Sequence, residues 1–135
     1  MASKALFIDT SAFYAFFDKR DSQHKRVFKI LRNSDDVFVT SNYVLDELIT
    51  LFRVRKLSLA QFEPFINSLW SEESCQLFRV SKDIDLLAWD MLKKLKEHNF
   101  SFTDCTSFVV MKNHNIKKVC TLDKHFQIAG FEIAR

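Results

Sequence analysis

Short apolar runs alternate along this chain with longer segments in which apolar residues recur at helical spacing. The pattern predicts strands at residues 5–8, 37–39, 76–80, 118–122 and 132–134. It predicts helices over residues 12–17, 22–33, 42–55, 59–70, 82–98, 103–114 and 124–128. Strands that alternate with helices are typical of an α/β fold, in which helices cover both faces of a mainly parallel sheet.

The size and composition of the chain fit a folded protein with one core. Its 135 residues are 47% hydrophobic and 27% charged, so we expect a single domain over residues 1–135. The net charge of +3 is too small to attract polyanions over the whole surface, so any nucleic-acid binding must be local. The sequence shows no cleavable leader pattern and no apolar run of membrane-spanning length, so we expect a cytoplasmic protein with reduced cysteines.

Four carboxylates lie beside short apolar runs, where ionised acids are least expected. Asp9 follows the first predicted strand, Asp123 follows the fourth, and Glu47 and Asp104 lie in apolar helical segments. Ionised acids near a core need hydrogen bonds, charge partners or a metal ion. Ligands of open α/β sheets bind at the carboxyl ends of the strands. If the first and fourth strands are neighbours, the four acids predict a shared cation site at that edge.

Helical phase separates Glu47 from the neighbouring Asp46. At about 100° per residue, Glu47 borders the apolar stripe that includes Val44 and Leu48, whereas Asp46 points away from it. We therefore assign Glu47, and not Asp46, to the predicted site.

Each acid also has an ordinary explanation when it is considered alone. Asp9 can simply end a strand, and Glu47 can flank a helix. Asp104 can stabilise the first turn of a helix capped by Thr103, because the helix dipole favours an anion there. The predicted cation site depends on all four acids favouring one edge of the sheet.

Several other classes of phosphate chemistry do not fit these residues. A phosphatase with an aspartyl nucleophile needs a second Asp two positions after Asp9, where this chain has Ser11. A two-component receiver domain needs an adjacent acidic pair after the first strand, but Thr10 follows Asp9. Phosphate-binding loops and dinucleotide folds need glycine-rich turns, and the chain has one glycine.

At these positions the chain resembles the PIN-domain nucleases, most closely the VapC-type toxins of toxin–antitoxin pairs. Four ordered pieces carry the resemblance over nearly the whole chain: Phe7 to Ser11, Val44 to Leu48, Phe102 to Asp104, and Thr121 to Phe131. Cys105 departs from the small residue, often alanine, that follows the third acid in that family. We expect this difference to be tolerated.

The resemblance implies a three-layer α/β/α sandwich with a five-stranded, mainly parallel sheet. It also implies RNA cleavage that depends on Mg²⁺ or Mn²⁺ and leaves 5′-phosphate and 3′-hydroxyl ends. Its catalytic and metal-binding residues would be Asp9, Glu47, Asp104 and Asp123, with Ser11 and Thr121 as supporting hydroxyls. These residue types suit the chemistry, because magnesium prefers oxygen ligands and uses few carboxylates.

Basic side chains near the same edge would receive the RNA backbone. We nominate Arg53, Arg55, Lys112 and Lys124, since phosphate contacts of this kind position a strand without determining its sequence. His125 follows Asp123 by two residues, but we expect it to be an ordinary surface histidine rather than a proton donor.

A toxin of this family would also bind a small antitoxin protein and form a homodimer. Two alternatives stay open: a PIN-like module that binds RNA or protein without cleaving, and a structure-specific DNA nuclease. The presence of all four acids argues against the first. The second would need helical insertions for which 135 residues leave no room.

Overall fold

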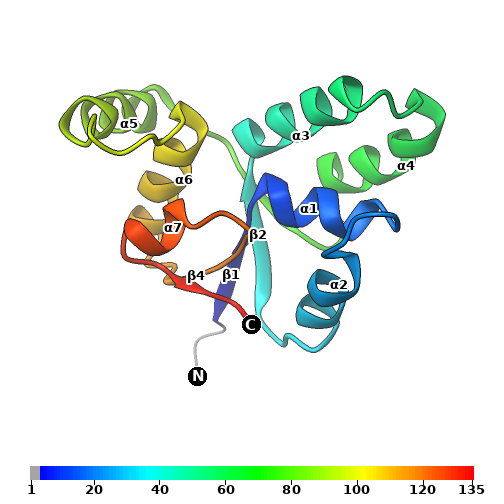
Figure 1. Cartoon of the computed structure of the whole chain (residues 1–135). Coiled ribbons are helices and arrows are strands. Elements are labelled where there is room, and N and C mark those ends of the chain that lie inside the picture. Colours follow the sequence, from blue (N-terminus) through cyan, green and yellow to red (C-terminus); the bar gives the residue numbers. More distant parts are fainter. Residues whose placement is uncertain (1–3) are drawn as a thin grey trace.

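Five strands form a central sheet in the order β3-β2-β1-β4-β5. The computed structural model describes residues 4–135 (Figure 1). The strands are β1 Ala5–Ile8, β2 Val37–Ser41, β3 Gln76–Phe78, β4 Lys118–Cys120 and β5 Glu132–Ile133. Every neighbouring pair is parallel, which confirms the predicted sheet.

Helices cover both faces of this sheet, as the strand–helix alternation predicts. They are α1 Thr10–Phe17, α2 His24–Arg32, α3 Asn42–Val54, α4 Leu59–Trp70, α5 Lys82–Lys94, α6 Phe102–Asn113 and α7 His125–Ile128. In Figure 1, helices α1 to α4 lie on one side of the sheet and α5 to α7 on the other. The three-layer α/β/α sandwich is thereby confirmed.

The strand order fixes where a ligand can bind. From β1 the chain proceeds to β2 and β3 on one side, then returns to β4 on the other side of β1. The order therefore reverses between β1 and β4, where ligands of open α/β sheets bind. Ile8 pairs with Cys120, and the Asp9 amide donates to the Cys120 carbonyl at 3.1 Å. The first and fourth strands are therefore neighbours, which is the condition on which the predicted shared site depends.

Phenylalanine side chains hold the helices on both faces. On one face, the Phe52 ring lies 4.9 Å from Phe17 and 4.8 Å from Phe62 between ring centroids. On the other face, Phe108 of α6 meets Phe126 of α7 edge to face at 5.0 Å. Buried aromatic pairs add stabilisation beyond their burial, so α6 and α7 are held firmly together.

Helix starts differ in detail from the sequence predictions. Asp9 is the N-cap of α1, and Ser101, rather than the predicted Thr103, caps α6. The Ser101 hydroxyl accepts from the Asp104 amide, and the Asp104 carboxylate accepts from the Ser101 amide. This reciprocal capping box satisfies two amides that Thr103 cannot reach from inside the helix.

The three cysteines, Cys75, Cys105 and Cys120, are free and buried. Burial raises their pKa values to about 12, 11 and 11 respectively, so the thiols stay protonated at neutral pH. The prediction of reduced core cysteines is confirmed. Within residues 4–135, every helix is too short or too polar to cross a membrane.

Candidate active site

Asp9 is a buried acid held at the end of β1. Its side chain is only 4% exposed, because the strand leads directly into α1 and Asp9 occupies the junction. The carboxylate accepts hydrogen bonds from the Thr121 hydroxyl at 2.9 Å and from the Ser11 hydroxyl at 3.4 Å. Two hydroxyls are weak compensation for a buried charge.

The environment of Asp9 raises its pKa to about 7 from an ordinary value of 3.8. Burial is the main cause, and the charges of Asp104 and Glu47 raise the pKa further, while the hydrogen bond from Thr121 opposes the shift. A carboxyl group with a pKa near neutrality and acidic neighbours is a common feature of functional sites.

Ser11 and Thr121 join the loop after β4 to the start of α1. Their hydroxyl oxygens are 3.2 Å apart, and the Ser11 hydroxyl accepts from the Leu122 amide at 2.9 Å. The Thr121 hydroxyl accepts from the Asp123 amide at 3.0 Å. Both predicted supporting residues therefore lie against Asp9 and fix the loop that carries Asp123.

Asp104 enters the site from the first turn of α6. Residues of the capping box orient it, since one carboxylate oxygen accepts from the Ser101 amide at 3.1 Å. The same oxygen lies 2.9 Å from Nδ1 of His125. The side chain is 9% exposed, so Asp104 is a second buried acid at this edge.

Asp104, Asp123 and His125 form a compact group of possible metal ligands. One ligand atom from each lies within 4.8 Å of the other two. His125 Nδ1 is also 3.4 Å from the Asp123 carboxylate, whose other oxygen accepts from the His125 amide at 2.9 Å. The hydrogen bond with Asp104 is the main cause that raises the pKa of His125. A protonated His125 can therefore partly neutralise both acids.

Glu47 approaches the same site from α3. It is half-buried, whereas Asp46 is exposed, as helical phase predicts. The negative charge of Glu47 contributes to the raised pKa of Asp9, so the two carboxylates interact electrostatically. Glu47 lies outside the three-residue ligand group, so its direct contact with a metal stays a prediction.

The donor set fits a hard divalent cation. Within residues 4–135, no Lys or Arg lies within 4 Å of the carboxylates of Asp9, Glu47, Asp104 or Asp123. Carboxylate oxygens without a Lys or Arg partner suit Mg²⁺ or Mn²⁺. Asp104, Asp123 and His125 are the described residues whose ligand atoms lie close enough to share such an ion, and Asp9 and Glu47 as further ligands stay a prediction.

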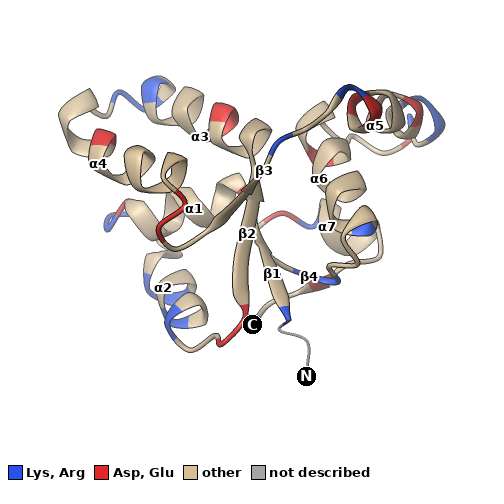
Figure 2. Cartoon of the chain, turned by 180° about the vertical axis from the view of Figure 1, so that it is seen from behind, with Lys and Arg blue, Asp and Glu red and all other residues tan. Residues whose placement is uncertain are grey.

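Basic residues nominated for RNA lie at unequal distances from this group. Lys124 is exposed and directly follows Asp123, but Arg53 and Arg55 lie at the far end of α3, where the Arg55 guanidinium stacks 4.5 Å above the Tyr14 ring. Figure 2 shows basic segments on α2 and at that end of α3. Lys112 was placed wrongly: it lies near the end of α6 in a depression with Lys117 and Glu132, at the opposite edge of the sheet.

The prediction of an ordinary surface histidine was wrong for His125. Its side chain is 30% exposed and contacts two of the four acids. The Phe100 ring packs against it at 5.2 Å, and α7 is fixed on α6 by Phe126. Only the proximity of His125 to Asp123 in the sequence gives a signal, because the contact with Asp104 depends on how α7 packs.

Comparisons with known proteins agree with this geometry. The chain is 30% identical over 129 residues to the 23S rRNA-specific endonuclease VapC20 of Mycobacterium tuberculosis, covering 93% of this chain and 95% of that protein. It is 28% identical over 131 residues to a VapC ribonuclease of Archaeoglobus fulgidus, covering 92% of this chain and 80% of that protein. Ribonuclease VapC26 of Mycobacterium tuberculosis is 26% identical over 125 residues, which cover 90% of this chain and 89% of that protein.

Solved structures share the fold. The crystal structure of Mycobacterium tuberculosis VapC20, described as a sarcin–ricin loop cleaving toxin, superposes with a TM-score of 0.88 over 96% of this chain and 99% of that chain, at 30% identity. FitAcB from Neisseria gonorrhoeae superposes with a TM-score of 0.61 over 96% of both chains, at 15% identity, which supports the fold alone. The family model of the PIN domain matches residues 6–132. The chain therefore belongs to the PIN domain family.

Proposed function

We propose that this protein is a metal-dependent endoribonuclease, the toxin of a toxin–antitoxin pair. It would hydrolyse RNA phosphodiester bonds at a Mg²⁺ or Mn²⁺ site formed by Asp9, Glu47, Asp104 and Asp123. Family membership and the similarity to proteins named as ribonucleases support the class of reaction.

One observation carries the assignment to these residues. Asp9 and Asp104 are both buried at the strand-order reversal, the charge of Asp104 raises the pKa of Asp9, and neither has a Lys or Arg partner among the described residues. Burying like charges together opposes folding unless a cation or protons neutralise them. Buried acids with acidic neighbours are typical of binding and catalytic sites.

The chain's own residues would position the reaction. Asp9, Glu47, Asp104 and Asp123 would hold the cation, and Ser11 and Thr121 orient Asp9 through their hydroxyls. His125 keeps Asp104 and Asp123 together in the absence of metal and can hold a proton at Nδ1. When bound, a divalent cation supplies positive charge that polarises a phosphodiester and acidifies water.

The proposal includes the setting of the reaction. The substrate is RNA, and 23S rRNA is the first to test because the VapC20 relative is named for it. We further propose a small antitoxin as protein partner, a homodimeric state, and action in the cytoplasm, where RNA is the accessible nucleic acid.

The direct experiment incubates the protein with 23S rRNA, an unrelated RNA and duplex DNA, each in Mn²⁺ and in chelator. We expect RNA cleavage in Mn²⁺ alone, with 5′-phosphate ends, and little cleavage of DNA. The matched control is the Asp9→Asn/Asp104→Asn variant, which should be inactive. Equal cleavage in chelator, equal cleavage by the variant, or a preference for DNA would contradict the proposal.

A further inference from the structure

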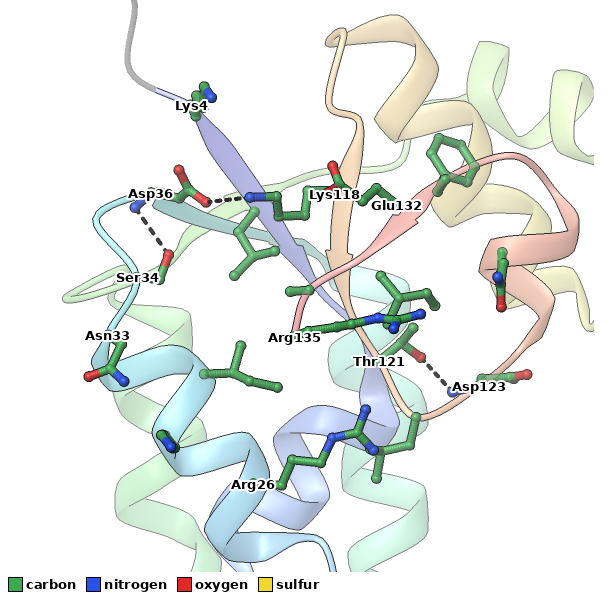
Figure 3. A pocket seen from close by; sticks show the side chains of 18 of the residues that line it. Lys4, Arg26, Asn33, Ser34, Asp36, Lys118, Thr121, Asp123, Glu132 and Arg135 are labelled. Carbon is green, nitrogen blue, oxygen red and sulfur yellow. Dashed lines mark hydrogen bonds and ion pairs between the residues drawn. The ribbon is translucent and has the colours of Figure 1, made fainter.

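A wide groove leads away from the acidic site. It lies between α2 and the strands β1, β4 and β5 and has a volume of about 1370 Å³ (Figure 3). Pockets for small ligands occupy roughly 300–1,000 Å³, so this groove has room for a stretch of polymer. A substrate strand could therefore lie along the groove.

The two ends of the groove differ in chemistry. At one end Lys118 lies 3.9 Å from Asp36, so these two lining charges pair with each other. At the other end the lining includes Thr121 and Asp123, which belong to the acidic site. A strand lying in the groove would thus extend directly from the candidate active site.

Basic side chains outnumber acidic ones among the described residues that line the groove. Six basic residues of the described part of the chain line it: Lys4, Arg26, Lys29, Lys118, Lys124 and Arg135. Among the described residues, neither Arg26 nor Arg135 has a carboxylate within 4 Å, and the one side-chain hydrogen bond of Arg26 is a long one of 3.4 Å to Gln23. These two guanidinium groups are therefore available to an anion.

The two arginines come from different parts of the chain and extend toward the same loop. Arg26 lies on the face of α2 that also presents Ile30 and Asn33 to the groove, at helical spacing. Figure 3 shows the Arg26 and Arg135 side chains extending into the groove toward the segment that carries Thr121 and Asp123.

We propose that Arg26 and Arg135 form a phosphate-binding subsite that holds the RNA strand beside the scissile bond. This inference rests on the proposed ribonuclease function. Guanidinium groups match phosphate oxygens in a bidentate arrangement, so two of them without acid partners select a phosphodiester backbone over an uncharged ligand. Contacts of this kind set the register of the strand and leave its sequence to other residues.

The test measures RNA binding without cleavage. A labelled single-stranded RNA is titrated with the full chain in chelator at several salt concentrations. We expect Arg26→Ala to weaken binding roughly 3- to 10-fold and to reduce the slope of log affinity against log salt by about 0.7, the value for one lost phosphate contact. Arg135→Ala should act in the same direction, and Arg26→Lys should retain part of the affinity because it retains the charge.

Arg32→Ala is the matched control. Arg32 is exposed on the same helix and lies outside the groove, so Arg32→Ala removes the same charge without removing a phosphate contact in the groove. Equal effects of Arg26→Ala and Arg32→Ala, or no effect of either, would overturn the subsite. So would a change in oligomeric mass for Arg26→Ala with unchanged RNA affinity, because the groove would then be a protein interface.

Failure of the subsite and failure of the proposed function give different results. Manganese-dependent RNA cleavage by the parent, combined with RNA binding that is insensitive to Arg26, overturns the subsite alone. A parent protein that neither binds nor cleaves RNA overturns both. Circular dichroism of each variant verifies that the exposed substitutions leave the fold intact.

Discussion

Acidic side chains at the two edges of the sheet have different partners. At the amino edge, Asp36, which directly precedes β2, lies 3.9 Å from Lys118 of β4, and both side chains reach solvent. At the carboxyl edge, Asp9 and Asp104 are buried, and their described partners are hydroxyls, amides and His125. The acid at the amino edge is therefore paired with a lysine, whereas the acids at the carboxyl edge have no Lys or Arg within 4 Å among the described residues.

The difference identifies which acids are structural and which are kept for another purpose. A surface pair such as Asp36–Lys118 contributes at most about 1 kcal/mol and needs no further explanation. The carboxyl-edge group opposes folding in the absence of a cation, as the pKa of about 7 for Asp9 shows. Such a cost is consistent with a binding or catalytic site.

The largest expected effect is on catalysis at the carboxyl edge. Asp9→Asn or Asp104→Asn should lower RNA cleavage by roughly 100-fold or more, because each removes an anionic oxygen from the proposed metal site. Single-turnover cleavage in Mn²⁺ measures this effect. Retention of more than a tenth of parent activity in both variants would show that these acids are not essential.

The pH dependence of stability should differ between parent and Asp9→Asn in chelator. The folded pKa of Asp9 is raised, so the folded state binds a proton that the unfolded state releases, and stability falls as pH rises from about 4 to 7. The shift from 3.8 to about 7 corresponds to roughly 4 kcal/mol. The pKa of His125 is also raised, so the titration of His125 also lowers the stability of the folded protein as pH rises, at the upper end of this range.

Urea unfolding between pH 4.5 and 8 tests this prediction. The difference in free energy of unfolding between Asp9→Asn and the parent should grow with pH. A difference that stays constant with pH would mean that Asp9 titrates normally.

A smaller effect should separate Glu47 from Asp46. Glu47→Gln should lower cleavage about 10-fold, because Glu47 borders the buried face of α3 and its charge acts on Asp9. Asp46→Asn should leave cleavage within about twofold, since Asp46 is exposed. The paired cleavage rates are the measurement, and equal losses would refute the assignment from helical phase.

The smallest effect is expected at the amino edge. Asp36→Asn should change the free energy of unfolding by less than about 1 kcal/mol and leave cleavage intact, because the pair is partly exposed. Chemical denaturation and the same cleavage assay provide both values. A large loss of activity would remove the contrast between the two edges.

Much of this arrangement follows from sequence periodicity. Asp9 and Asp123 could be placed because each follows an apolar strand, and Glu47 because helical phase is regular over α3. The capping box at Ser101 and Asp104 also has a sequence signature, three residues apart, which the choice of Thr103 overlooked.

Two errors have different physical origins. Lys112 lies eight residues after Asp104 on α6, so the helix carries it about 12 Å away, toward the amino edge. Helix direction alone could have shown this. The contact of His125 with Asp104 could not be predicted locally, because it depends on Phe108 and Phe126 packing α7 against α6.

The most direct test of the shared cation site is the melting temperature with and without Mn²⁺. Parent protein and the Asp9→Asn/Asp104→Asn variant are each heated in chelator and in Mn²⁺. At a hundredfold excess of Mn²⁺ over Kd, the parent should gain on the order of 10 °C, because the ion binds only the folded state. The variant should gain little; an equal gain in both proteins, or none in the parent, would contradict a metal site at the carboxyl edge.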